Sequence, residues 1–248
     1  MREQHPFHIA DLEELHTELF SRADRVVPMR DIFKGDTSPR VIGLRHDVDD
    51  NTGSFETALR MAEWEFEHGY SSTYFLLHGS YYWTEDWLPA APQFEELGHE
   101  VGIHVNAIAE GLRQKRDPHA ILADAIFELR GTGVRVVGCV AHGDQLCHTA
   151  KFVNDEIFEE SPRPDYGAPD RLIEHEGVIH PLVTVPRANY GLEYDANWLP
   201  RGDYLSDSGG RWSQYFEGVV SRFGEGQLHV LQHPDWWAEA FVPESVAA

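Results

Sequence analysis

The sequence predicts an α/β protein: a distorted (β/α) barrel of about seven parallel strands, preceded by a helical N-terminal extension. Three observations favour this fold. Short apolar runs alternate with amphipathic segments along the chain, a pattern typical of βαβ units and parallel sheets. Aspartates and histidines recur just after the apolar runs, at the end of the sheet where parallel α/β folds place their functional residues. The length of 248 residues suits a single barrel domain.

The individual elements follow in order from these patterns. The first 40 residues form the predicted extension, with a helix near residues 11–20. Strands are expected at residues 41–44, 72–77, 100–105, 134–141, 178–185 and 228–232. Helices are expected at residues 54–69, 87–97, 120–130 and 212–223. We find no internal repeat or linker, so residues 1–248 are taken as one domain, with the barrel at residues 41–240.

The helix at residues 54–69 has the clearest predicted boundaries. Its apolar residues recur at helical spacing, and Gly69 provides a C-terminal stop. Asp50 or Asn51 is expected to cap its N-terminus, because Asp and Asn side chains accept hydrogen bonds from the first N–H groups of a helix.

The charge excludes one class of function. Forty-two acidic residues against 20 basic ones leave a net charge of −22, so a nucleic-acid-binding protein is not expected, because phosphate binding requires Lys and Arg. An anionic membrane surface is disfavoured for the same reason. Most of the acids are expected to coat the surface, as in salt-adapted proteins, where solvated carboxylates keep the chain in solution.

The location is predicted to be the cytoplasm. No apolar stretch reaches the 18 or more residues of a membrane span, and the N-terminal residues do not resemble a signal peptide. Cys139 and Cys147 are the two cysteines, and we expect both to be free thiols in a reducing compartment.

Polar residues cluster at the predicted strand ends. The acidic residues are Asp47 and Asp49, and the histidines are His78, His104, His142 and His233. In an extended chain the D-x-D spacing puts both carboxylates on one side, but a turn after the strand would point them in different directions. One carboxylate and two imidazoles leave an open coordination position, which is the usual composition of a catalytic zinc site. A structural zinc site using His142, Cys147 and His148 is the alternative.

At these residues the chain resembles a known family, the polysaccharide deacetylases of carbohydrate esterase family 4, in the divergent branch marked by an R-H-D-V-D motif. The matching segments are RHDVD at 45–49, ALRMA at 58–62, STYF at 72–75, GHEVGIH at 98–104, AHG at 141–143, SDSGGRW at 206–212 and QHP at 232–234. The resemblance covers residues 40–240 in the family's order. It implies a distorted barrel, a divalent metal, usually zinc, and hydrolysis of an N-acetyl amide.

The resemblance also implies roles for individual residues. Asp47 corresponds to the general base and Asp49 to a metal ligand. His104 corresponds to the first ligand histidine of the second motif, and His233 to the general acid of the final motif. Asp207 corresponds to the carboxylate that orients that general acid.

Two positions depart from the family pattern. Ile108 stands where the second ligand histidine is expected, and His142 is the best replacement. Cys139 stands near the position of the third-motif arginine that tethers the base. Arg45 or Arg211 would have to substitute for that arginine.

The expected reaction is removal of an N-acetyl group from an amino sugar or a polysaccharide precursor. Arg211 is expected to bind a carboxylate or phosphate of the substrate, and Trp212 is among the aromatic residues on which a sugar ring would stack. Two alternatives remain open: a related C–N hydrolase acting on a small non-sugar amide, and a carbohydrate-binding member that has lost its metal. The expected partners are a carbohydrate or a small amide, with no nucleic acid or membrane, and the oligomeric state is not predicted.

Overall fold

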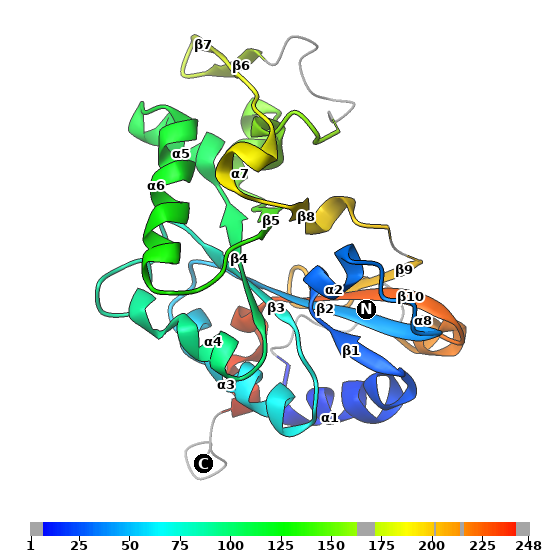
Figure 1. Cartoon of the computed structure of the whole chain (residues 1–248). Coiled ribbons are helices and arrows are strands. Elements are labelled where there is room, and N and C mark those ends of the chain that lie inside the picture. The colour runs from blue at the N-terminus through cyan, green and yellow to red at the C-terminus, as the bar shows by residue number, and fades with distance from the viewer. Residues whose placement is uncertain (1–6, 163–171, 201, 214–215, 242–248) are drawn as a thin grey trace.

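A computed structural model describes residues 7–162, 172–200, 202–213 and 216–241. Its main sheet is parallel, and its strands follow the order β8-β5-β4-β3-β2-β10-β9, with β1 also paired to β2. The strands are β1 Arg25–Val27, β2 Arg40–Val48, β3 Thr73–Leu77, β4 Glu100–Val105, β5 Gly138–Ala141, β8 Tyr194–Asp195, β9 Asp203–Ser206 and β10 Gly226–Gln232. The sheet curls into a half-barrel (Figure 1). The predicted α/β class and distorted barrel are therefore confirmed.

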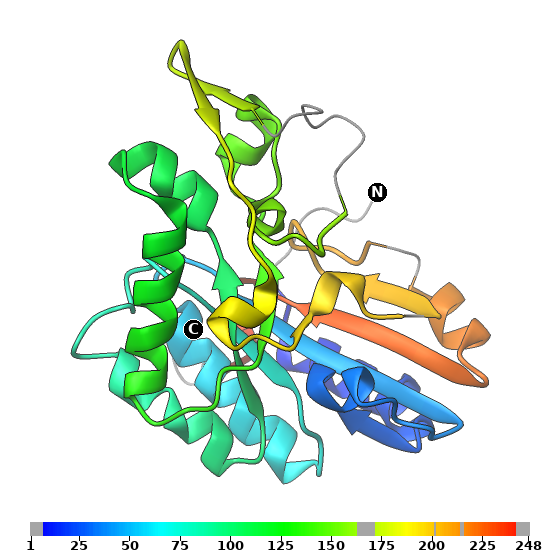
Figure 2. The same ribbon diagram turned by 45° about the horizontal axis from the view of Figure 1, so that its top comes forward.

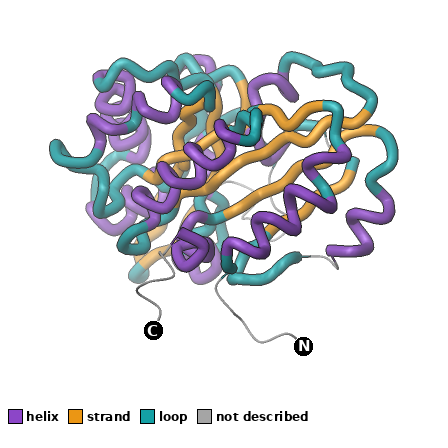
Figure 3. The backbone as a smooth tube through the Cα atoms, turned by 90° about the horizontal axis from the view of Figure 1, so that it is seen from below, coloured by secondary structure: helices purple, strands orange, loops and turns teal. Residues whose placement is uncertain are grey.

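Helices cover the outside of the curled sheet (Figure 3). They are α1 Ile9–Glu18, α2 Met29–Phe33, α3 Ser54–Glu67, α4 Pro92–Glu96, α5 Ala107–Gln114, α6 Pro118–Gly131, α7 Gln145–Ala150 and α8 Phe216–Arg222. The short 3-10 segments are η1 Phe20–Arg22, η2 Leu88–Ala90, η3 Asn154–Ile157, η4 Arg187–Tyr190, η5 Ala196–Trp198 and η6 Pro234–Phe241. The exception to this outer layer is α2, which packs against the inner face of β2 (Figure 2).

Some predicted elements differ from the structure. The predicted strand at 178–185 is wrong, because β7 Val178–Pro181 pairs antiparallel with β6 Leu172–His175 in a separate hairpin. The main sheet instead takes β8 and β9 from that part of the chain. The first 40 residues are more than a helical extension, since β1 joins the sheet beside β2. The helix α5 was not predicted.

The predicted cap of α3 is also wrong. Gly53, with φ of 90°, occupies the N-cap position, and no side chain caps the helix. The carbonyl oxygen of Asn51 accepts the Ser54 N–H at 2.9 Å, while the Asn51 side-chain amide donates to Asp235. The Asp50 carboxylate accepts the Tyr81 N–H at 2.6 Å. The side chains of Asp50 and Asn51 therefore stabilise the loop after β2 instead of capping α3.

The alternation of β2 places its functional residues inside the curl. Successive side chains of a strand point to opposite faces, and Val41 belongs to the inner apolar cluster whereas Ile42 and Leu44 belong to an outer one. Arg45 and Asp47 share the inner face with Val41. Both side chains are buried, at 6% and 4% exposure, so the charged residues of the motif lie in the interior of the half-barrel.

The amino-terminal half of the interior is filled with side chains. A Cβ at Gly102 would overlap the ring of Phe75, and one at Gly138 would overlap the ring of Tyr194. These two glycines therefore let large aromatic rings fill the curl. The N-terminus of α2 is held here, because the Arg30 N–H donates to Glu100 at 3.0 Å. Glu100 is buried among these rings, whereas Arg45 and Asp47 lie further toward the carboxyl ends of the strands.

A buried polar network ties the outer face of β2 to α3. His46 Nε2 lies 2.7 Å from Glu65 Oε1, and the other oxygen of Glu65 accepts the hydroxyls of Ser72 at 2.6 Å and Tyr74 at 3.0 Å. Burial raises the pKa of Glu65, but His46, His99 and the Ser72 hydroxyl lower it further, so the net pKa is below its ordinary value. The charged Glu65 carboxylate thus holds β2 at His46, the residue directly before Asp47.

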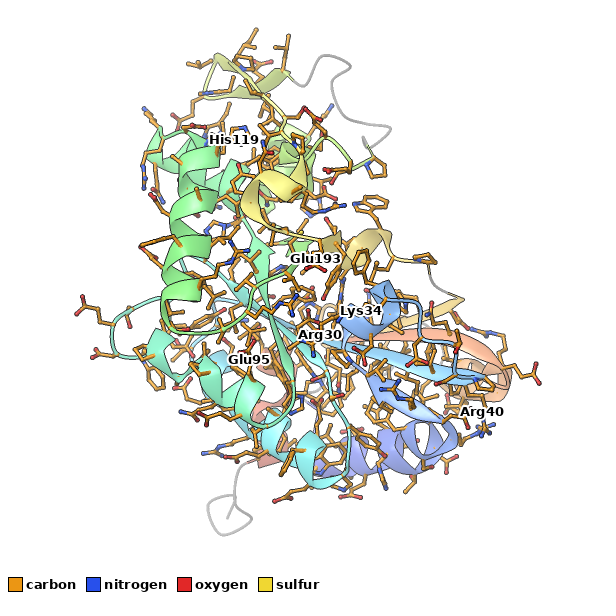
Figure 4. All side chains as sticks on the ribbon, in the orientation of Figure 1. Arg30, Lys34, Arg40, Glu95, His119 and Glu193 are labelled. Atoms are coloured by element: carbon orange, nitrogen blue, oxygen red, sulfur yellow. The ribbon has the colours of Figure 1, made fainter. Side chains whose placement is uncertain are left out.

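The surface is charged at the end of the sheet where β2 begins. Figure 4 shows Arg40 at that end, far from Arg30 and Lys34 on α2. Arg40 lies 2.6 Å from Asp24.

Among the described residues, no helix combines the length and apolar character that a membrane crossing requires.

Candidate functional site

Three potential metal ligands converge at the carboxyl ends of β2, β4 and β5. Asp49 Oδ1 lies 3.4 Å from His104 Nε2 and 3.1 Å from His142 Nδ1, and the two imidazole nitrogens are 3.2 Å apart. Among the described residues, this is the one group of three or more His, Cys, Asp or Glu side chains with ligand atoms this close together. The structure therefore brings together the three residues predicted to bind a metal.

The geometry of this group fits a small divalent cation. Zinc lies about 2.0–2.1 Å from nitrogen and oxygen ligands in a tetrahedral arrangement, which places neighbouring ligand atoms about 3.3–3.4 Å apart. The three observed separations of 3.1–3.4 Å are close to this value. His104 Nδ1 donates to the Val140 carbonyl oxygen at 3.1 Å, which directs the lone pair of Nε2 toward Asp49. Oδ1 of Asp49 is buried without a hydrogen-bond partner.

The electrostatics of the three residues favour a cation as well. Burial raises the pKa of Asp49, but the adjacent imidazoles of His104 and His142 lower it well below its ordinary value. Asp49 is therefore ionised. Burial lowers the pKa of His142, whereas the Asp49 carboxylate raises it above its ordinary value. The carboxylate thus attracts positive charge to the centre of the group.

Asp47 lies beside this group and is held by an arginine. Its Oδ2 is 4.0 Å from His104 Nε2, and its Oδ1 is 3.5 Å from Arg45 Nε. Arg45 also donates from Nη1 to Asn197 Oδ1 at 3.1 Å. Of the two arginines considered as tethers for the base, Arg45 is therefore the one in contact with Asp47. Arg211 is exposed on the loop after β9.

His233 reaches the site from the neighbouring strand. In the pairing of β10 with β2, Gln232 lies opposite His46, so His233 follows β10 at the level of Asp47. Its Nδ1 is 2.6 Å from Asp207 Oδ1. Burial lowers the pKa of His233, but the bond to Asp207 and the charges of Asp207, Asp47 and Asp49 raise it to about 9. The imidazole is thus a cation at neutral pH, with Nε2 as its second proton donor.

The remaining predicted residues lie outside this group. The ring of Trp212 packs 5.1 Å from Phe7 and 5.8 Å from Phe216, in an outer apolar cluster. Ile108 and Cys139 are buried in the core. Cys147 is buried next to Asn154, while His148 is exposed, so these two do not join His142 in a closed site.

Two further polar residues lie at this end of the sheet: Asp235, which the sequence patterns did not assign to the site, and the strand-end histidine His78. Asp235 accepts the side-chain amide of Asn51; burial and the charge of Asp49 raise its pKa to about 6. Asp235 thus contacts the loop after β2 two residues beyond Asp49. His78 accepts the Asn106 N–H at 2.9 Å, and burial, with His104 and His142, lowers its pKa to about 4. The neutral His78 supports the loop after β4 rather than binding a ligand.

In comparisons with known proteins, no family model and no curated protein sequence matches the chain.

Proposed function

We propose that the protein is a metal-dependent hydrolase that removes an N-acetyl group from an amino sugar. The observation that carries this proposal is the convergence of Asp49, His104 and His142 beside an inward-facing Asp47. A carboxylate and two imidazoles are typical of catalytic zinc sites, which leave a position for water. This arrangement, together with the resemblance to carbohydrate esterase family 4, supports hydrolysis of a C–N bond.

The three ligand residues would hold the cation, with zinc the expected metal. When bound, a divalent metal of this kind lowers the pKa of a coordinated water and polarises a carbonyl group. The chain contributes the orientation of its ligands, because the Val140 carbonyl fixes the ring of His104.

Asp47 would act as the general base. Amide hydrolysis requires that the attacking water lose a proton, and a carboxylate placed within reach of the water contributes roughly 10²–10⁴-fold. The Arg45 guanidinium, 3.5 Å from Oδ1, forms a buried ion pair with the carboxylate. Oδ2 is left facing the side of His104, where the water proton would be transferred to it.

His233 would act as the general acid. When the C–N bond breaks, the leaving nitrogen must take up a proton. His233 is protonated at neutral pH, because Asp207 holds its pKa at about 9. Since Nδ1 is bonded to Asp207, the proton is delivered from Nε2. Asp47 and His233 thus provide the base and the acid from neighbouring strands.

The test combines metal analysis with an acetate-release screen. The purified protein is expected to retain close to one zinc, cobalt or nickel ion per chain and to release acetate from N-acetylglucosamine oligomers. Asp49→Ala should abolish both properties. Asp50→Asn is the matched control, because Asp50 lies outside the ligand group and its carboxylate accepts the Tyr81 N–H. Absence of metal binding, with hydrolytic rates unchanged by Asp49→Ala, would overturn the proposal.

The same screen separates the sugar substrate from a small amide. Release of acetate or ammonia from acyclic amides alone, with no activity on N-acetyl sugars, would assign the site to a different C–N hydrolase.

A further inference from the structure

Trp198 is the most exposed tryptophan of the protein. All seven tryptophans lie in the described ranges, and Trp198 is the one whose surface is more than a third exposed, at 50%. The others pack into the core or lie partly covered against it; Trp237, for example, is fully buried. Single exposed apolar residues are common on protein surfaces, so Trp198 is of interest because of where it lies and how it is held.

The ring of Trp198 is held in place although it is exposed. Its Nε1–H donates to Asp155 Oδ2 at 2.6 Å, and Asp155 is itself only 1% exposed. No described aromatic ring stacks on Trp198 in the way that Phe55 stacks on Tyr82. A ring fixed along its N–H edge loses little conformational freedom when a ligand covers it, so binding is less costly in entropy.

The ring lies next to the residues that position the general base. Trp198 ends η5, and the residue before it, Asn197, accepts the Arg45 guanidinium at 3.1 Å. The same guanidinium lies 3.5 Å from Asp47. The side chains of Asn197 and Arg45 thus link the segment at Trp198 to the carboxylate of the proposed base. Figure 2 shows this segment following β8 toward β9, at the carboxyl end of the sheet.

The charge around the ring limits the kind of ligand. Asp155 lies against the indole, and the buried Asp195 begins the same turn by accepting the Asn197 N–H at 2.9 Å. The site beside it contains Asp47 and Asp49. Carboxylates on both sides, in a chain of net charge −22, disfavour phosphorylated or acidic ligands. Neutral and cationic ligands remain, and among these a neutral sugar ring is the one that the proposed function supplies.

We propose that Trp198 is the platform on which a neutral sugar ring of the substrate stacks, and that it selects carbohydrate amides over acyclic ones. This inference rests on the proposed function and adds a specificity-determining residue to it. Trp198 is given no part in the proton transfers. Its contribution is to binding, so its loss should weaken the complex and leave the rate at saturation intact.

The expected effect follows from the usual strength of aromatic contacts. Such contacts change affinity by about 2- to 13-fold. Trp198→Ala should therefore raise KM for the N-acetylglucosamine trimer by about tenfold, with kcat within about twofold of the wild type. Trp198→Phe keeps a ring but loses the bond to Asp155, so its KM should lie between the two. Metal content should be the same in all three proteins.

Two controls make the test specific. Phe66→Ala removes another large exposed ring, 56% exposed, from the outer helix α3, and should leave KM unchanged. N-acetylethanolamine carries the same amide without a ring, and its kinetics should be the same in wild type and Trp198→Ala. An unchanged KM for the trimer in Trp198→Ala, or an equal loss on both substrates, overturns the platform.

Calorimetric binding of the trimer to each protein separates this inference from the proposed reaction. If no acetate is released but the trimer binds and Trp198→Ala weakens that binding about tenfold, the platform stands and the deacetylase fails. If Trp198→Ala releases acetate from the trimer with the KM of the wild type, the deacetylase stands and the platform fails. Failure of the wild-type protein to bind the trimer at millimolar concentration overturns the platform.

Discussion

Asp207 holds His233 through both its side chain and its backbone. Oδ1 lies 2.6 Å from the imidazole Nδ1, and both carboxylate oxygens accept the His233 backbone N–H, at 3.0 and 2.9 Å. Oδ2 also accepts the indole N–H of Trp237 at 2.7 Å. Because Asp207 is fully buried, its charge acts on the imidazole with little screening by water. One carboxylate thus sets the position, the orientation and the charge of the proposed general acid.

Asp207→Asn should lower the pKa of His233 from about 9 toward the ordinary value of about 6.5. The alkaline limb of the rate profile should move down in pH accordingly, and NMR titration of the imidazole should report the same change. Asp203→Asn, on the same strand but paired with Arg222, is the control. An alkaline limb that stays in place would contradict the assigned acid.

The same pair should make stability depend on pH. The pKa of His233 is raised in the folded protein, so its stabilising contribution is complete below about pH 6.5 and is lost as the pH rises through about 9. Urea unfolding at pH 6 and pH 9.5 should show this loss in the wild type and a smaller one in Asp207→Asn. Equal losses in both proteins would contradict the interaction.

His142→Gln should release the metal from the proposed centre. A ligand that binds only the folded state stabilises it by about 2.7 kcal/mol at a concentration of 100 times Kd, so zinc should raise the unfolding temperature of the wild type but not of the variant. His148→Gln is a matched control, because that histidine is exposed six residues further along the chain. Equal zinc-induced shifts in both variants would remove His142 from the site.

Arg45→Lys should lower kcat by about 10- to 100-fold with little change in KM, because displacement of a reacting group by about 1 Å can cost a factor of 10². Lysine keeps the charge but cannot contact both Asp47 and Asn197 with a planar fork. Metal content should be unchanged. Arg116→Lys, in a surface pair with Asp124, is the control, and an unaltered kcat in Arg45→Lys would argue against the tether.

Glu65→Gln should destabilise the fold by about 3 kcal/mol at pH 7, since removal of one partner from a buried charged network leaves the other groups uncompensated. The pKa of Glu65 is lowered in the folded state, so its contribution is present above about pH 4.3 and is lost as the pH falls below that. Urea unfolding at pH 7 and pH 4 should show the difference narrowing. Glu67→Gln, exposed on the same helix, should have little effect at either pH.

The acidic surface should make stability depend on salt. A net charge of −22 repels itself in the compact state, and the screening length falls from about 10 Å at 0.1 M to about 3 Å at 1 M salt. The unfolding temperature should therefore rise by several degrees in molar potassium chloride. A flat or falling curve would count against salt adaptation.

The site residues could be predicted from the sequence where a polar residue directly follows an apolar strand. Asp49, His104 and His142 could be grouped because each follows a strand of a parallel sheet, and parallel strands end at a common edge. The sequence left Arg45 and Arg211 as alternative partners of Asp47. The contact with Arg45 could not be chosen from the sequence, because the neighbouring strands decide which face of β2 points into the half-barrel.

Other features depended on information that local patterns do not contain. β8 spans two residues and β9 contains little apolar sequence, so neither resembles a buried strand. Val178 and Ile179 look like core residues but are exposed in a hairpin. Asp235 reaches the site through a turn after β10, and its contact with Asn51 joins segments distant in the chain.

The pairing of β2 with β10 joins residues near the two ends of the chain, Arg40 with Gly226 and His46 with Gln232. Loop closure over such a distance is slow and unfavourable until the intervening strands are in place. During synthesis, Asp47 leaves the ribosome well before His233, which follows β10. A nascent chain can therefore hold the proposed metal ligands before it holds the proposed general acid, and the site is complete only after β10 has been made.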